Sequence, residues 1–185
     1  MRKPLLLIAV ASVLVSACST TPQARSTYLL RSSSHVATGK LAEVGDAYLG
    51  TVQVASYIDQ PGLVLEVEEG MIHIAKQHQW AEPLRVSLRE FLNVEISAAN
   101  DEALAASPLE DAAASRIDVR ISQLHGDAEG HAVLLASWSL SSAKQRHEYQ
   151  FAETTALDGV GYEALVKAEI KLLIQLSKAI ARELK

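Results

Sequence analysis

Hydrophobic and polar positions alternate with a period of two along much of the first half of the chain. This period is typical of strands, because successive side chains point to opposite faces of a sheet. It predicts strands at residues 28–30, 47–58, 63–67 and 71–75. The last two flank a Glu-Glu-Gly turn at residues 68–70, so we expect them to form a hairpin.

The period changes to that of a helix after Glu82. Apolar side chains then recur at spacings of three and four residues, at Leu84, Leu88, Phe91, Leu92 and Ile96. Pro83 precedes them. Backbone N–H groups at this position have no hydrogen-bond partner within the helix, so a proline costs nothing there. The pattern predicts an amphipathic helix of about 15 to 18 residues. A polar, alanine-rich passage follows, so the sequence does not define the residue at which this helix ends.

The second half repeats the order of strands followed by a helix. Strands are predicted at 117–121, 132–140 and 146–154, and a long helix at 162–184, with Asp158 as its candidate N-cap. The fold class is therefore α+β, with one antiparallel sheet and two helices packed on one face. We expect the apolar stripes of both helices to be buried, above all Leu88, Phe91, Leu165, Leu172, Leu173 and Leu176.

The first twenty residues have the order of a lipoprotein signal peptide. Arg2 and Lys3 precede an apolar run at 5–15, and small residues lead to Ala17 and Cys18. The run is shorter than the roughly 20 apolar residues that span a bilayer. We therefore expect residues 1–17 to be removed, residues 18–27 to form a lipidated tether, and residues 28–185 to form one domain. An ordinary signal peptide with an incidental cysteine is the alternative.

Charge and cysteine content exclude several functional classes. The chain has 17 Lys and Arg against 22 Asp and Glu, and removal of the signal leaves 15 against 22, a formal charge of −7. Such an acidic body does not suggest binding to nucleic acid. Cys18 is the single cysteine, so its lipidation leaves no thiol for a disulfide, a metal or a nucleophile.

Motifs of catalysis and of metal binding are absent from the sequence. It has no Gly-x-Ser-x-Gly elbow, no phosphate-binding glycine loop and no His-Glu-x-x-His. His73 and His78 are odd-spaced and lie on opposite faces of an ideal strand, whereas His125 and His131 flank a turn and could face each other. A metal site usually needs three or four ligands. We therefore expect no metal, no cofactor and no enzymatic activity.

Trp80 allows two interpretations. It can pack over the start of the predicted helix, next to Leu84, or it can contact a partner, since tryptophan is enriched at the energetic centres of interfaces. We therefore take Trp80, with Glu68, Glu69 and Gly70 at the predicted hairpin turn, as the candidate partner-binding residues. Trp138, in the centre of a strand, is assigned to the core.

Several of these segments together resemble the PqiC/YmbA family of ABC-transport auxiliary lipoproteins. The similar segments cover nearly the whole mature chain in order: the Ala17-Cys18 lipobox, Tyr28–Leu30, Asp59–Gly62, Gln79–Leu84, Ala136–Trp138, Tyr162–Val166 and Leu176–Ala181. The Trp-Ala-Glu-Pro-Leu sequence at 80–84 is the most specific of them. The alanine-rich passage within residues 93–115 departs from the family pattern.

The resemblance implies a fold similar to the N-terminal domain of TolB and no enzymatic activity. It implies a protein held on the periplasmic face of the outer membrane by lipid on Cys18, with Ser19 favouring that membrane under the enterobacterial sorting rule. The implied partner is an MCE-domain (PqiB-like) protein of a lipid transport system. Phospholipid is a candidate ligand, and a homo-oligomer, such as a ring, is a candidate assembly.

Two other functional classes stay open at this point. The chain could be the lipoprotein interaction module of another envelope assembly or of a cell-wall machine, which would share the anchor and the lack of catalysis. It could also be a periplasmic hydrolase with an unfamiliar site, which would require a deep cleft with converging titratable groups.

Overall fold

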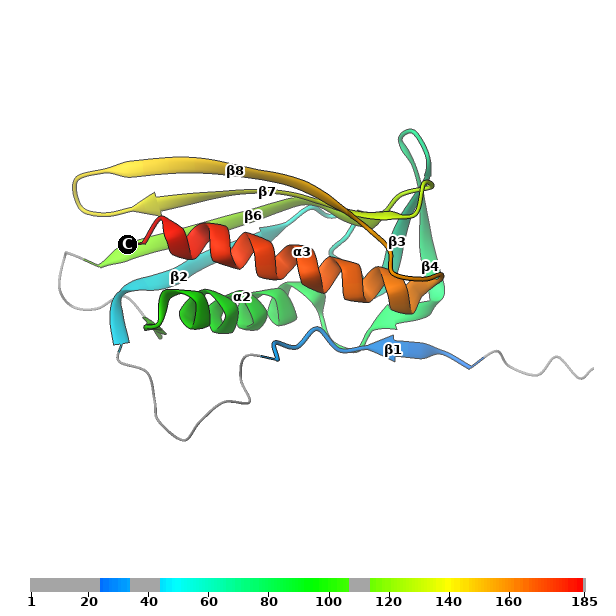
Figure 1. Cartoon of the computed structure of the whole chain (residues 1–185), viewed down its shortest axis with the longest axis horizontal. Coiled ribbons are helices and arrows are strands. Elements are labelled where there is room, and N and C mark those ends of the chain that lie inside the picture. The colour runs from blue at the N-terminus through cyan, green and yellow to red at the C-terminus, as the bar shows by residue number, and fades with distance from the viewer. Residues whose placement is uncertain (1–23, 34–43, 107–113, 185) are drawn as a thin grey trace, which may run out of the picture.

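The structure, a computed structural model, describes residues 24–33, 44–106 and 114–184. Its strands are β1 (Ser26–Tyr28), β2 (Val44–Val54), β3 (Gly62–Glu68), β4 (Met71–Trp80), β5 (Ala103–Ala105), β6 (Ser115–Gly126), β7 (His131–Ser141) and β8 (Arg146–Ala156). Its helices are α2 (Leu84–Asn100) and α3 (Tyr162–Arg182). All the strands belong to one curled sheet (Figure 1).

The sheet is organised around β6. On one side β7 pairs antiparallel along the whole of β6, and β8 pairs antiparallel with β7. On the other side β2 runs parallel to the first half of β6, while β3 meets β6 only where Leu65 faces Gly126. The antiparallel β3–β4 hairpin continues from there, and β1 lies parallel to the end of β4. The short β5 lies parallel to β2.

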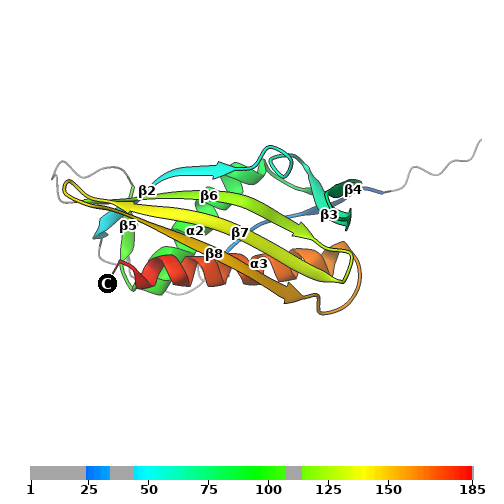
Figure 2. The same cartoon turned by 90° about the horizontal axis from the view of Figure 1, so that it is seen from above.

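Both helices cover the same face of the sheet, and the opposite face of β2, β6, β7 and β8 is left open. Figure 2 shows these strands lying across α2 and α3. In β6, Ile117, Val119 and Ile121 are buried towards the helices, whereas Arg120 on the open face is exposed. The alternation that the sequence shows in β6 therefore separates a helix-covered core face from a polar solvent face.

The predicted α+β class and the burial of the helical stripes are confirmed. Leu88, Phe91, Leu165, Leu172, Leu173 and Leu176 are each at most 2% exposed. The prediction of a purely antiparallel sheet is wrong, because the sheet contains both parallel and antiparallel pairs. The consecutive pairs β3–β4, β6–β7 and β7–β8 form antiparallel hairpins. However, β2 reaches β6 only through a long connection that includes α2, and such crossovers produce parallel pairs.

Several local boundaries differ from the sequence prediction, and three of them change the picture most. β4 extends to Trp80, which is longer than the predicted strand. α2 continues to Asn100 and ends at Asp101, whose φ of 61° is left-handed, and β5 follows it within the alanine-rich passage. α3 is preceded by Gly161 at φ 83°, with no side-chain cap, so Asp158 as the N-cap is wrong.

The first prediction concerns the packing of α3. Leu173 is fully buried, so Leu173→Ala should lower the free energy of unfolding by about 2–5 kcal/mol through lost burial and a residual cavity. Urea unfolding followed by circular dichroism measures this change. The control is Leu29→Ala, because Leu29 is 56% exposed, and it should change stability by no more than about 0.5 kcal/mol. Equal effects of the two substitutions would contradict the packing described here.

The second prediction concerns Glu169, a buried carboxyl on α3 whose Oε2 has no hydrogen-bond partner. Burial raises the pKa of Glu169 from 4.5 to about 8. Between these pH values the unfolded chain binds fewer protons than the native one, so the free energy of unfolding should fall as pH rises across this range. Glu169→Met removes the titration and should flatten the pH dependence.

Urea unfolding of both proteins at pH 5 and pH 8 is the measurement. The variant should gain stability relative to the native protein between the two pH values, on the order of a few kcal/mol. The same loss of stability with rising pH in both proteins would show that Glu169 is not its source.

Candidate docking site

The end of the β3–β4 hairpin, residues 67–74, is exposed and rich in apolar side chains. We call this segment the hairpin tip; it stands away from the rest of the fold in Figure 1. Its exposed apolar side chains are Val67 (41%), Met71 (47%), Ile72 (39%) and Ile74 (40%). Exposed apolar side chains gathered on one projecting element are typical of a protein or membrane contact.

The turn of the hairpin tip is acidic and sharply bent. Glu68 and Glu69 are exposed, and neither takes part in an ion pair among the described residues. Gly70 has a φ of 73°, which a residue without Cβ adopts readily. Its N–H donates to Oε1 of Glu66 at 2.8 Å. The sequence prediction of a turn at residues 68–70 is confirmed.

The base of the hairpin packs against β6 at Gly126. A Cβ on Gly126 would lie 2.6 Å from Leu65 Cδ2, so a larger residue there would require the Leu65 side chain to move. Beside it, His125 is buried, its Nε2 lies 4.0 Å from Glu66 Oε2, and its ring meets that of Tyr57 edge-on at 6.1 Å. Burial, together with the nearby Glu66 charge, raises the pKa of Tyr57 to about 12. The phenol is therefore neutral at physiological pH.

The other end of β4 is held by an aromatic stack. The Tyr28 hydroxyl and His78 Nδ1 are 2.9 Å apart, and their ring centroids are 6.0 Å apart. Tyr162, at the start of α3, also stacks on His78, with ring centroids 4.2 Å apart. The stack therefore joins β1, β4 and α3.

Trp80 lies in the core, at 7% exposed. Its backbone N–H donates to Pro61 O at 2.8 Å, and its side chain helps to line a small cavity of about 310 Å³ with Pro61, Pro83 and Leu84. Burial favours the interpretation that Trp80 packs over the start of α2. The structure thus places Trp80 apart from Glu68, Glu69 and Gly70, which lie at the opposite end of β4 and β3.

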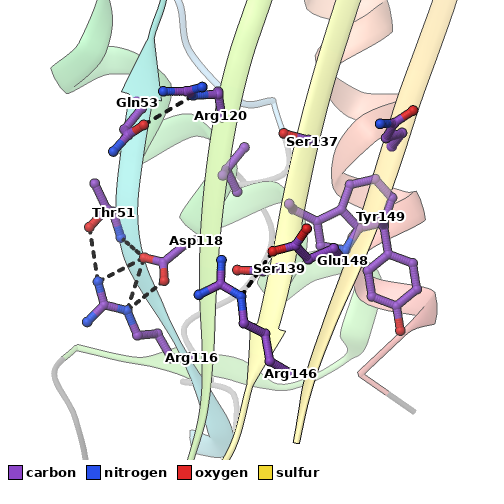
Figure 3. Close-up of a pocket in the computed structure, with 13 residues that line it drawn as sticks. Thr51, Gln53, Arg116, Asp118, Arg120, Ser137, Ser139, Arg146, Glu148 and Tyr149 are labelled. Atoms are coloured by element: carbon purple, nitrogen blue, oxygen red, sulfur yellow. Dashed lines mark hydrogen bonds and ion pairs between the residues drawn. The ribbon is translucent and has the colours of Figure 1, made fainter.

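The open face of the sheet forms a second candidate surface, a shallow depression of about 690 Å³. Figure 3 shows its polar side chains, which come from β2, β6, β7 and β8. Arg120 Nε donates to Gln53 Oε1 at 3.2 Å, and Arg146 Nε donates to Glu148 Oε1 at 3.1 Å. Ser137 adds a hydroxyl from β7.

The strongest ion pair of this face joins Arg116 to Asp118, with Arg116 Nε 2.8 Å from Asp118 Oδ2. Burial acts to raise the pKa of Asp118, but hydrogen bonds from Arg116 and Thr51 outweigh it and hold that pKa below its ordinary value. Asp118 is therefore an ionised partner of Arg116 and is unsuited to act as an acid or a base near neutral pH. The depression offers hydrogen bonds and paired charges.

The histidines pair with separate carboxylates. His131 Nδ1 lies 3.0 Å from Asp127 Oδ2, and His125 lies near Glu66, so the two do not form the facing pair that the sequence allowed. Across residues 24–33, 44–106 and 114–184, no group of three or more His, Cys, Asp or Glu side chains is arranged to hold a metal ion.

The predicted anchor residue Cys18 lies outside the described residues. Neither helix within them has the length and hydrophobicity needed to cross a bilayer. The apolar character of the hairpin tip was missed in the sequence. A signal was nevertheless present, because Met71 and Ile72 are adjacent apolar residues and would occupy opposite faces of a strand of which only one face can be covered.

Comparison with known proteins gives consistent results. A family model described as ABC-type transport auxiliary lipoprotein component matches residues 28–181. The intermembrane transport lipoproteins PqiC of Escherichia coli K12 and of Shigella flexneri are each 27% identical to this chain over 138 residues, which is 72% of this chain and 72% of each relative.

Two crystal structures have a similar fold. An uncharacterized protein superposes with a TM-score of 0.76 at 24% identity, covering 88% of this chain and all of the other. A protein from Xanthomonas campestris superposes with a TM-score of 0.59 at 14% identity, covering 84% and 92% of the two chains. At these identities the likeness supports the fold alone. Because the family model extends from the end of β1 to the last turn of α3, the chain belongs to the family of ABC-type transport auxiliary lipoprotein components.

Proposed function

We propose that this protein is an auxiliary subunit of an MCE-type lipid transport system, anchored on the periplasmic face of the outer membrane, that acts by binding other proteins. The observation that carries the proposal is the hairpin tip, where Val67, Met71, Ile72 and Ile74 are exposed on a projecting element. Family membership supports an auxiliary role in transport, and its relatives PqiC are named as intermembrane transport lipoproteins.

The chemistry of the hairpin tip favours a protein over a lipid surface as its target. Glu68 and Glu69 lie between the apolar side chains of the two strands, and two carboxylates would be repelled by anionic lipid headgroups. Apolar side chains next to charged ones are common in protein interfaces. The hairpin tip is therefore the surface that we assign to an MCE-domain (PqiB-like) partner, whereas Trp80 packs in the core at the opposite end of β4.

The anchor sets the geometry of the proposed complex. With lipid on Cys18, the polar residues from Ser19 to the start of β1 would form a tether of only about 15 Å in root-mean-square length. The domain then stays close to its own membrane, and the partner has to span the periplasm. In this arrangement the partner carries the lipid across the periplasm, and the lipoprotein holds the outer-membrane end of the partner in place. Several copies around a symmetric partner would form a ring.

The third prediction tests the anchor. Cys18→Ala should abolish acylation, because the thiol is the atom that receives the lipid, and should leave an uncleaved precursor or a soluble product. Metabolic labelling with a palmitate analogue, followed by gel analysis of the full-length chain, is the measurement. Ser16→Ala is the control and should keep its label. A labelled Cys18→Ala protein would exclude Cys18 as the acylated residue.

The fourth prediction tests the hairpin tip. Val67→Asp should weaken co-purification of the full-length lipoprotein with an MCE-domain partner at least tenfold, because it buries a charge in an apolar contact. The control is Val86→Asp, since Val86 is a 52% exposed valine on α2, away from the hairpin. Both variants should unfold at nearly the same urea concentration as the native protein.

Two outcomes would count against the proposal. If Val67→Asp binds the partner as well as the native protein does, the docking surface is not at the hairpin tip. Co-purification with a β-barrel assembly factor or a cell-wall protein, and with no MCE-domain protein, would assign the lipoprotein to another envelope machine.

A further inference from the structure

The solvent-exposed side of α3 is strongly basic. The helix turns its apolar stripe to the core, and its outer side is open to solvent (Figure 1). The exposed positions of α3 are Glu163, Lys167, Lys171, Gln175, Lys178 and Arg182. Because an α-helix has about 3.6 residues per turn, the four cations lie within a sector of about 60° and extend over about 22 Å of the axis. We call Lys167, Lys171, Lys178 and Arg182 the basic stripe.

Little negative charge opposes the basic stripe. Lys167 Nζ lies 2.7 Å from Glu163 Oε1, and this is the single ion pair of the stripe among the described residues. Lys171 Nζ donates to the Thr155 hydroxyl at 3.2 Å, which leaves its charge uncompensated. Glu169, the other acidic residue of α3, is buried. The stripe therefore presents a net positive charge to solvent.

Neither the helix dipole nor the overall charge explains the stripe. A cation in the last turn stabilises a helix, and Arg182 lies there. Lys167 and Lys171 lie in the N-terminal half, where the dipole does not favour a cation. The whole chain is acidic, with 17 Lys and Arg against 22 Asp and Glu. The basic stripe thus gives an acidic protein one positively charged side.

The turn before α3 presents an apolar side chain at the end of the same helix. Val160 is 95% exposed. It is flanked by Gly159 at φ 115° and Gly161 at φ 83°, conformations that glycine adopts readily and other residues do not. An exposed aliphatic side chain close to lysines and arginines is a typical composition of a surface that lies in a membrane interface.

The proposed tether would enter the domain next to this turn. Ser26, the first residue of β1, faces His78 in the parallel pair of β1 with β4. His78 stacks on Tyr162, the first residue of α3, with ring centroids 4.2 Å apart. Figures 1 and 2 agree in placing the start of β1 at the end of the molecule where α3 begins. A lipid anchor attached here keeps α3 within reach of the membrane surface.

We propose that the basic stripe and Val160 form a contact surface for the membrane that holds the anchor. The stripe lies against anionic phospholipid headgroups, and Val160 inserts among them. The inference rests on the proposed lipid anchor and adds an orientation to it. α3 lies along the membrane, and the open face of the sheet, on the other side of the domain, is turned away from it.

The composition of this surface favours lipid over an acidic protein. Lysine is depleted in protein interfaces, whose centres are rich in aromatic side chains. Three of the four stripe residues are lysines, and no large apolar side chain of α3 itself is exposed. Lysines next to a membrane are attracted to anionic lipid without fixed partners. A basic patch is also the usual second signal that strengthens a lipid anchor.

A fluorescent probe on the stripe tests the contact in the full-length lipoprotein. Gln175→Cys is labelled with the environment-sensitive dye NBD, since acylated Cys18 has no thiol to react. The protein is inserted into vesicles of phosphatidylcholine, with or without a quarter of phosphatidylglycerol. With phosphatidylglycerol we expect emission at shorter wavelength and several-fold stronger quenching by spin-labelled lipid. The same dye at Gln150→Cys, on the open face, should report water in both vesicles.

Exchange of charge tests the role of the stripe. Lys171→Glu with Lys178→Glu, in the labelled Gln175→Cys protein, should abolish the quenching. The matched control, Lys76→Glu with Lys144→Glu, changes the net charge equally at exposed positions outside α3 and should retain it. Salt at about 1 M should also abolish it, because the screening length falls to about 3 Å. Equal loss in the two double variants, with unfolding in urea unchanged, would overturn the proposal.

Val160 should enter the lipid more deeply than the stripe. The dye at Val160→Cys should be quenched more strongly by spin labels on the acyl chains than the dye at Gln175→Cys, because lysines keep their charged ends at the headgroups. The reverse order of depth would contradict insertion of Val160.

Flotation of the vesicles distinguishes failure of the contact from failure of the anchor. Protein that floats with phosphatidylglycerol vesicles while the dye at residue 175 stays in water would overturn the contact and leave the anchor intact. Protein that does not float, or a native chain whose Cys18 takes up the dye, would overturn the anchor and this proposal with it. Shielding of the dye by an MCE-domain protein, and not by lipid, would assign the stripe to a protein partner, against the proposal.

Discussion

The packing of α3 is the contact on which the rest of the structure depends. This helix lies against β6, β7 and β8 and also against α2, and its side chains Leu172, Leu173, Leu176 and Ile180 are inaccessible to solvent. The sheet is covered on one face only, so this face holds the apolar core of the domain. Burial of this apolar surface stabilises a domain whose other sheet face is polar.

This one-sided construction explains where contacts with other molecules can form. The open face of β2, β6, β7 and β8 satisfies its charges internally through Arg116 with Asp118 and Arg146 with Glu148. Exposed apolar side chains gather instead at the hairpin tip, which lies on the opposite side of β6 from β7 and β8 in the sheet.

The sequence predicted most of the elements because each carries its own periodicity, but it could not predict contacts between distant segments. The stripes of α2 and α3 were read correctly, since burial of a helix face leaves a clear spacing in the sequence. The parallel pairs of β2 with β6 and of β1 with β4 were missed, because register between distant strands depends on tertiary packing. β5 was missed because Ala103–Ala105 has no alternation. For Trp80 the residue type alone allowed both core and surface, and only packing against Pro61 and Leu84 decides between them.

The stack of Tyr28, His78 and Tyr162 has a mechanical consequence in the proposed anchored complex. There β1 would follow the tether, so tension from the membrane would reach β1 first and pass through the stack to β4 and α3. β4 carries the stack at His78 and the hairpin tip at Met71, about 24 Å apart at the usual rise per residue of a strand. In that complex the same strand would carry the pull of the membrane at one end and the proposed docking surface at the other. A partner bound at the tip would be held at a fixed lever arm from the anchor rather than at the end of a slack chain.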